Sequence, residues 1–153
     1  MTANIHPFLT TYLGTCVPDF GKASVMQIAN NGLLPRFNKY SGVAEWNNAL
    51  FLWVNLDGHT YTNTFTHHAQ HMMWYGGSKM HKDSRVIIRL RTEVDKLLFV
   101  RREGEHYCCL GRVDAVAGDY DAHPIAIKLH LRDYEALAKT SGYFQEILRH
   151  VRK

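Results

Sequence analysis

The chain has 153 residues, of which 46% are hydrophobic and 21% charged, as in a soluble globular domain with one core. No apolar run approaches the roughly 20 residues of a transmembrane helix, and the N-terminus has no secretory signal pattern, which predicts an intracellular protein (nuclear in a eukaryote, cytoplasmic in a bacterium). The net charge of +4 mildly favours a polyanionic partner.

The cysteines Cys16, Cys108 and Cys109 make a poor disulfide framework, because their number is odd and two of them are adjacent. We therefore expect a reducing compartment. There is no CxxC pair to support a thiolate zinc site. Cys108 and Cys109 fall in a predicted strand, where cysteines usually act as small core residues, and a redox role is the alternative.

The first predicted elements are a short helix and a buried strand. Residues 21–34 favour a helix that ends at an Asn-Gly pair, with Pro35 beyond it as a stop signal. Residues 49–56 (ALFLWVNL) form a short apolar run that is typical of a buried strand. An Asp-Gly turn pair follows, and residues 61–65 alternate in polarity, which predicts a hairpin partner for this strand.

The middle of the chain predicts a strand followed by a helix. The strand covers residues 70–75 and ends at two glycines. Ser84 is a candidate N-cap for the helix. One face of that helix carries the apolar residues Ile87, Leu90 and Val94, and another carries Arg85 and Arg89, four residues apart.

The C-terminal third predicts three strands and two closing helices. Residues 97–101 and 106–116 are strands separated by a Glu-Gly turn, and residues 125–131 alternate as a strand with one buried face. Asp133 and Ser141 are candidate N-caps of the helices. The second helix has one apolar stripe, made by Phe144, Ile147, Leu148 and Val151.

These elements together predict one α+β domain over residues 1–153. Five or six strands, mostly antiparallel, would curl into a partly closed β-barrel with helices packed on the outside. We find no internal repeat, low-complexity tract or linker that would divide the chain.

Motifs of common hydrolases are missing from the sequence, which has no GxSxG, no P-loop and no GxGxxG at a strand-to-helix turn. An enzymatic alternative remains in a small metal-dependent nuclease or hydrolase. Its candidate ligands are His67, His68 and His71, with Asp57 or Asp83. The segment lacks the glutamate of HExxH, so a polar loop or phosphate contacts are the interpretation favoured over a metal site.

Basic residues gather after the strand at 70–75. Lys79, Lys82, Arg85, Arg89 and Arg91 lie within thirteen residues, and Arg101, Arg102 and Arg112 lie on or beside later strands. Such a patch would suit a phosphate backbone. The alternative is a solvated helix face on a plain protein-interaction module.

Two aromatic residues stand next to this basic segment. Trp74 and Tyr75 are consecutive strand residues, so they point to opposite sides and are not both buried in one core. Gly76 and Gly77 follow, where a ligand can approach the backbone closely. This arrangement favours a stacked base with its phosphate alongside; the alternative is a core Trp74 and a surface Tyr75.

Several short motifs occur in a characteristic order: YTNTF (61–65), MMWYGGS (72–78), LLFVRR (97–102), HYCCLGRV (106–113) and PIAIKLHLRDYEAL (124–137). In this order they resemble the PUA-like superfamily of SRA, YTH, EVE and ASCH domains. The resemblance is nearest to the modified-base readers attached to modification-dependent restriction proteins and helicases. It covers about residues 55–148, and residues 1–50 are an unassigned extension of the same domain.

The resemblance implies a non-enzymatic module without a cofactor that flips a modified base, in DNA rather than RNA, into an aromatic pocket. An effector domain would lie in the same or another protein. The implied pocket residues are Trp74, Tyr75, Gly76, Gly77, Ser78, Tyr61 and Asn63, with Trp46 and Tyr40 as a second wall. The implied backbone contacts are Lys79, His81, Lys82, Arg85, Arg89, Arg101 and Arg112.

Overall fold

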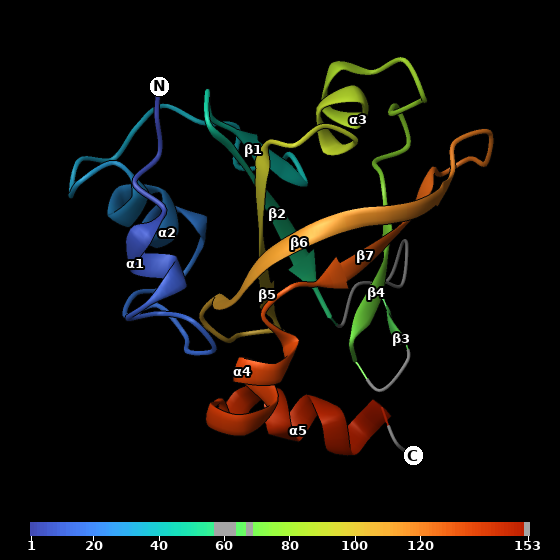
Figure 1. The fold of residues 1–153 in the computed structure, drawn as a ribbon. Coiled ribbons are helices and arrows are strands. Elements are labelled where there is room, and N and C mark those ends of the chain that lie inside the picture. Colours follow the sequence, from blue (N-terminus) through green and yellow to red (C-terminus); the bar gives the residue numbers. More distant parts are fainter. Residues whose placement is uncertain (57–63, 67–68, 152–153) are drawn as a thin grey trace.

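The computed structural model describes residues 1–56, 64–66 and 69–151, which form a seven-stranded mixed sheet and five helices (Figure 1). The helices are α1 (His6–Leu9), α2 (Lys22–Ala29), α3 (Arg85–Leu90), α4 (Tyr134–Thr140) and α5 (Gly142–Val151). The strands are β1 (Val43–Glu45), β2 (Ala49–Asn55), β3 (Thr64–Thr66), β4 (His71–Tyr75), β5 (Asp95–Arg101), β6 (Cys108–Asp119) and β7 (Ala126–Leu131). The predicted α+β class is confirmed.

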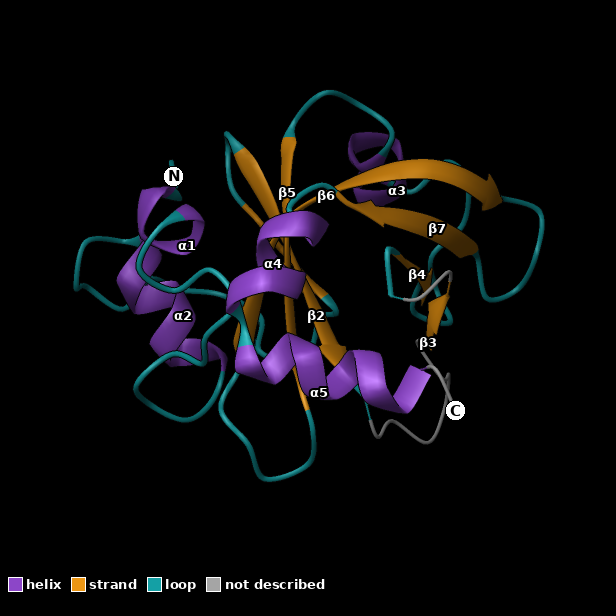
Figure 2. Cartoon of the chain, turned by 60° about the horizontal axis from the view of Figure 1, so that its bottom comes forward, coloured by secondary structure: helices purple, strands orange, loops and turns teal. Residues whose placement is uncertain are grey.

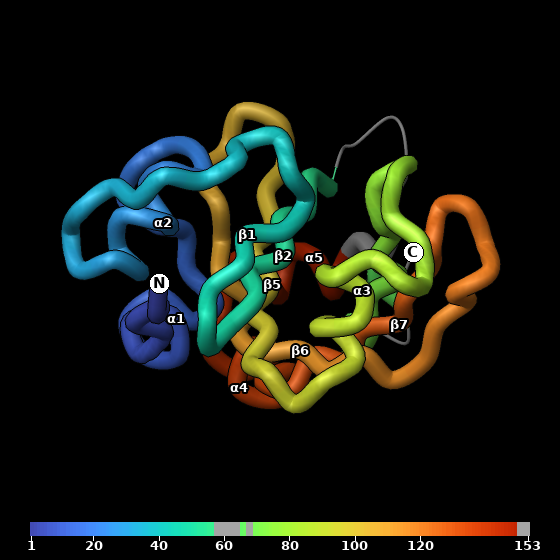
Figure 3. The backbone as a smooth tube through the Cα atoms, turned by 90° about the horizontal axis from the view of Figure 1, so that it is seen from above, coloured from blue at the N-terminus to red at the C-terminus, as the bar shows by residue number. Residues whose placement is uncertain are grey.

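The strands follow the order β1-β2-β5-β6-β7-β4-β3. Only the β2–β5 pair is parallel among the described strand pairs, so the mostly antiparallel character is also confirmed. Within the described residues the sheet is not closed, because β1 and β3 stand at its two edges. Figure 3 shows β1 beside β2 at one of these edges. The predicted partial closure into a barrel is therefore not confirmed.

The predicted hairpin after β2 is wrong in the part that the structure describes. Thr64, Phe65 and Thr66 pair with β4, whereas β2 lies between β1 and β5. Residues 57–63 lie outside the described residues. Local alternation predicted a strand correctly, but a strand's partner depends on long-range packing that alternation does not encode.

Strand β2 is buried on both faces, which explains its continuous apolar sequence. Leu52 and Val54 belong to one core cluster, and Phe51 and Trp53 belong to a second cluster on the opposite face. Parallel strands are usually covered on both faces in this way. The sheet therefore needs a layer of structure on each side.

The N-terminal segment supplies one of these layers. Helices α1 and α2 lie together at one side of the sheet, drawn in blue in Figure 1, and their buried residues share a core with Phe51 and Trp53. Gly14 and Val17 donate backbone hydrogen bonds to the carbonyls of Cys109 (2.7 Å) and Tyr107 (2.9 Å). The part of the chain left unassigned by the resemblance is thus integral to the fold.

The other three helices cover the opposite face. Ile87 and Leu90 of α3, and Leu137, Phe144 and Leu148 of α4 and α5, pack into the first core cluster. Figure 2 shows α4 and α5 in front of the central strands, away from α1 and α2. No helix in the described part of the chain has the length and apolar character to cross a membrane.

The three predicted N-caps behave differently. The Ser141 hydroxyl accepts a hydrogen bond from the Phe144 N–H at 3.1 Å, as a capping residue does. Ser84 and Asp133 stand at N-cap positions without a capping bond from their side chains. The Asp133 carboxylate instead accepts the backbone N–H of Arg112 at 2.9 Å, so it connects α4 to β6.

Candidate functional site

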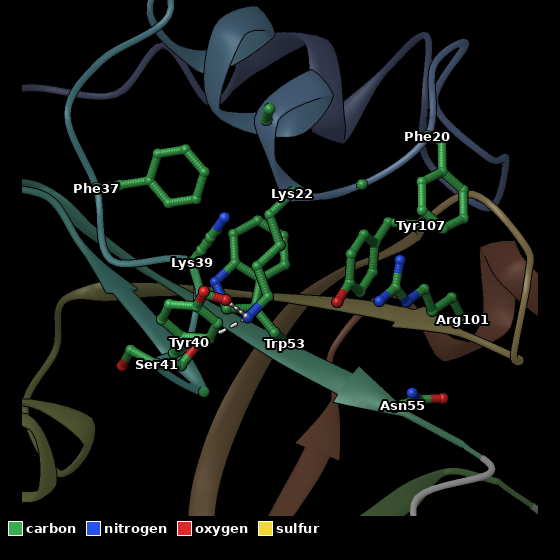
Figure 4. A pocket seen from close by; sticks show the side chains of 13 residues that line it. Phe20, Lys22, Phe37, Lys39, Tyr40, Ser41, Trp53, Asn55, Arg101 and Tyr107 are labelled. Atoms are coloured by element: carbon green, nitrogen blue, oxygen red, sulfur yellow. Dashed lines mark hydrogen bonds between the residues drawn. The ribbon is translucent and has the colours of Figure 1, made fainter.

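A pocket of about 460 Å³ lies between the start of α2, the segment before β1 and the β2–β5 face of the sheet (Figure 4). Its aromatic lining residues are Phe20, Phe37, Tyr40, Trp53 and Tyr107, and its cations are Lys22, Lys39 and Arg101. The thirteen lining residues include no carboxylate. The volume is in the range of small-ligand pockets.

Trp53 and Tyr107 form the aromatic floor. Strand alternation places Trp53 on the face that α2 covers, where its ring centroid lies 5.1 Å from that of Tyr107 and 5.2 Å from that of Phe99. The Trp53 side chain is buried, and its indole Nε1 has no hydrogen-bond acceptor among the described residues. That N–H is therefore a buried donor without a described partner.

Lys22 reaches over this floor from the first position of α2 (Figure 4). Its ammonium donates to the backbone carbonyls of Lys39 (2.8 Å) and Ser41 (2.9 Å) and lies 5.7 Å from the centre of the Trp53 ring. Burial, together with the smaller effect of the nearby positive charge of Arg101, lowers the pKa of Lys22 to about 8.

Arg101, the last residue of β5, closes the other side of the pocket. Its guanidinium lies 4.5 Å from the centre of the Tyr107 ring and 5.1 Å from that of Phe20. Burial raises the pKa of the Tyr107 hydroxyl, against the opposing effect of the Arg101 charge. The Nε of Arg101 is buried and has no acceptor in the described part of the chain.

The charges of the pocket are not neutralised by neighbouring acids. The ion pairs of residues 1–56, 64–66 and 69–151 involve other basic side chains, and none includes Lys22, Lys39 or Arg101. The Arg101 charge lowers the pKa of Lys22, and neither cation has a carboxylate partner among the described residues, so the two together form a site suited to an anion.

Two exposed aromatic side chains stand at the rim. Tyr40 is 86% exposed and Phe20 is 59% exposed. The Lys39 ammonium lies 5.3 Å from the centre of the Tyr40 ring. The pocket thus combines a buried aromatic floor with aromatic and cationic groups at its mouth.

The sequence-predicted site residues do not converge on one place. Tyr40 and Arg101 line this pocket, but Trp74 and Trp46 are each 2% exposed and belong to the two different core clusters. Trp74 points inward with Met72 because β4 alternates, and it packs among apolar residues. Trp74 therefore does not form an open stacking surface, which corrects the prediction from its neighbouring glycines.

The residues after Trp74 lie on a separate surface. Tyr75 is half-buried on the other face of β4, and Gly76 is buried, with its N–H donating to the Ile125 carbonyl at 2.9 Å. Gly77, Ser78, Lys79, His81 and Lys82 are exposed. Tyr61 and Asn63, which were predicted to read the base edge, lie outside the described residues.

The predicted backbone-binding arginines are partly engaged in ion pairs. Arg85 and Arg89 both contact the Glu45 carboxylate at 3.3 Å, and Arg89 also donates to the Trp46 carbonyl at 2.7 Å. Arg112 pairs with Asp133 at 3.3 Å. These interactions tie α3 to β1 and β6 to α4, so a structural role accounts for these three residues.

The alternative of a metal-dependent nuclease or hydrolase depends on His67, His68 and His71, of which His67 and His68 lie outside the described residues. His71 is on β4, with its ring centroid 5.0 Å from that of His130 on β7. Within the described ranges, no group of three or more His, Cys, Asp or Glu residues could hold a metal ion.

Sequence reasoning missed most of the pocket. The resemblance leaves residues 1–50 unassigned, and these include Lys22, Lys39, Phe20 and Phe37. Trp53 and Tyr107 were predicted only as parts of the strands at residues 49–56 and 106–116. The available signal was the mixture of aromatic and basic residues over positions 20–40. No protein-family model and no curated protein matches this sequence.

Proposed function

We propose that this chain is a PUA-like nucleic-acid-binding module that takes one unstacked, modified base into the pocket of Trp53 and Tyr107. Lys22, Lys39 and Arg101 hold the adjacent phosphates. No catalytic step is part of this proposal. An effector domain or protein would act on the bound nucleic acid.

The observation that carries the proposal is the set of three pocket cations without an acidic partner in the described chain. Ordinary surface lysines and arginines are neutralised or solvated, whereas Lys22 is half-buried beside Arg101. A phosphate group would relieve this like-charge repulsion and accept hydrogen bonds from both side chains.

The aromatic lining supports a base rather than a simple anion. Stacking on an aromatic side chain contributes about 1–3 kcal/mol per base, which offsets the few kcal/mol that unstacking costs. A bound base would also need hydrogen-bonding groups around the aromatic floor. Asn55 and Ser41 line the same pocket and offer further donors and acceptors.

The apolar wall supports a modified base. A methyl group that leaves water for an apolar pocket adds about 0.8 kcal/mol of affinity. That alone gives modest discrimination, so a strong preference requires that the unmodified base leave a polar group of the pocket unpaired. The resemblance to modified-base readers points to the same ligand class.

The test is a binding titration with labelled DNA and RNA oligonucleotides, each unmodified, cytosine-modified or adenine-modified, at two salt concentrations. Lys22→Met should weaken binding at least tenfold, which is about 1.4 kcal/mol, and reduce the salt slope by about one. Tyr40→Ala should weaken binding through lost stacking with little effect on stability, because its side chain is exposed.

Two matched variants locate the interface. Lys139→Met removes the same charge from α4, on the opposite side of the sheet. This variant should bind the oligonucleotides as tightly as the wild-type protein does. Lys79→Met tests the exposed loop after β4. If Lys79→Met weakens binding and Lys22→Met does not, the loop is the interface and the pocket proposal is wrong. If no oligonucleotide binds, the nucleic-acid function itself is rejected.

A further inference from the structure

Two cysteines face each other where the N-terminal segment crosses β6. Cys16 is exposed and Cys108 is fully buried, and both are free thiols. The two residues form an isolated antiparallel bridge. This pairing connects residues that are distant in sequence, and the sequence alone gave no reason to associate them.

The surrounding backbone hydrogen bonds define the type of this bridge. The Val17 N–H donates to the Tyr107 carbonyl at 2.9 Å, and the Cys109 N–H donates to the Thr15 carbonyl at 3.2 Å. These bonds flank the cysteines, which therefore occupy a non-hydrogen-bonded pair. The Cα atoms of such a pair lie about 4.5 Å apart, within the roughly 4.4–6.8 Å that a disulfide spans.

The two thiols are chemically different. A hydrogen bond from the Cys108 thiol lowers the pKa of Cys16 to about 7, whereas the same contact and burial raise the pKa of Cys108. The exposed Cys16 is therefore a thiolate for much of the time at neutral pH, and the buried Cys108 stays protonated.

Charged and titratable groups from two elements face this pair. Arg102, Glu105 and His106 come from the β5–β6 connection, and Tyr143 comes from α5. Arg102 is held by Glu105 at 3.3 Å and by Glu146 at 3.4 Å. The contact with Cys108 has the largest effect on the pKa of Cys16, which burial and Glu105 oppose and His106 and Arg102 reinforce.

We propose that Cys16 and Cys108 form a reversible cross-strand disulfide when the protein meets a hydroperoxide. The Cys16 thiolate attacks a peroxide oxygen and breaks the O–O bond, which gives a sulfenic acid and hydroxide. The Cys108 sulfur then attacks the Cys16 sulfur, its proton leaves with the departing hydroxyl as water, and the S–S bond forms. Two thiols lose two electrons, one hydrogen peroxide becomes two waters, and a small thiol reverses the oxidation.

The disulfide would crosslink the N-terminal layer to β6 beside Tyr107, which lines the pocket. Formation of this disulfide does not depend on what the pocket binds. Oxidation and oligonucleotide binding are measured separately, so failure of one proposal leaves the other standing.

The test is to treat the reduced protein with hydrogen peroxide, block the remaining thiols with a maleimide under unfolding conditions, and map the peptides. Free thiols should fall from the three of the sequence to one. The map should join the Cys16 and Cys108 peptides within one chain and show Cys109 blocked, and dithiothreitol should restore all three thiols. Cys16→Ser, which changes an exposed side chain, should retain both remaining thiols.

Two outcomes overturn the proposal. One is that Cys108 remains a free thiol while Cys16 becomes a sulfinic acid or an intermolecular disulfide. The other is a pH profile of Cys16 alkylation that differs from the expected one. Alkylation of Cys16 should accelerate as pH rises through about 7, because the thiolate fraction grows there. A midpoint at the ordinary value of a free cysteine contradicts the activation of Cys16 at neutral pH.

Discussion

Trp74 and Trp53 are both strand tryptophans, and their different environments decide what each can do. Trp74 is enclosed by the apolar core between the sheet and the helices of one face. Trp53 is also buried, but it lines a pocket with its indole N–H left without an acceptor among the described residues. A residue type therefore indicates a possible chemistry, and the surrounding elements decide whether a ligand can reach it.

Replacing Trp74 with alanine should destabilise the protein rather than selectively remove binding. Loss of a buried tryptophan leaves a cavity, and we expect the free energy of unfolding to fall by about 3–5 kcal/mol. Urea unfolding measures the change, with Tyr75→Ala, half-buried on the opposite face, as the smaller comparison. Near-native stability together with lost oligonucleotide binding would instead restore the stacking role of Trp74.

Helix α5 illustrates how one polar residue can position a whole element. Ser141 is buried, accepts the Phe144 N–H at 3.1 Å and donates its hydroxyl to the Gly14 carbonyl at 2.6 Å. It therefore starts the helix and ties it to the N-terminal layer at the same time. Phe144 and Leu148 of this helix pack into the first core cluster.

Ser141→Ala should lower the free energy of unfolding by about 2 kcal/mol, because it removes a helix cap and leaves the buried Gly14 carbonyl without its donor. Chemical denaturation gives the value. Ser78→Ala, on an exposed loop, should change stability by less than about 0.5 kcal/mol. Equal effects of the two substitutions would argue against the capping role.

At the scale of the whole molecule, the N-terminal layer and the central strands depend on each other. Phe51, Trp53, Leu97 and Phe99 share a core cluster with residues of α1 and α2. Strand β2 is the parallel partner of β5 and the antiparallel partner of β1. The range of the PUA-like resemblance, about residues 55–148, begins where β2 ends and so omits a central strand.

A fragment of residues 55–153 should accordingly fail to fold cooperatively. It would leave one edge of β5 unpaired and expose the apolar face that α1 and α2 cover. Thermal unfolding and dispersion of amide NMR signals compare the fragment with the full chain. A sharp unfolding transition in the fragment would mean that residues 1–54 are a separable attachment.

Local patterns predicted most elements but few of their partners. The continuous apolar run of β2, the alternation of β7 and the stripe of α5 each reflect a burial period that is written into neighbouring residues. Helix α1 and strand β1 were missed because elements of four and three residues carry almost no periodic signal. Tyr40 and Arg101 were the predicted site residues that the fold brought to the pocket.

By itself, the sequence determined the α+β class, the mostly antiparallel strands and the positions of the longer elements, because these depend on propensity and periodicity over short windows. Only the tertiary structure decided that Trp74 is core, that Lys22 meets Trp53 and Arg101, and that Cys16 faces Cys108. Each of these environments brings together residues from separate elements of the fold. Such contacts arise from the packing of the two core clusters, in which a side chain's neighbours come from elements far apart in the chain.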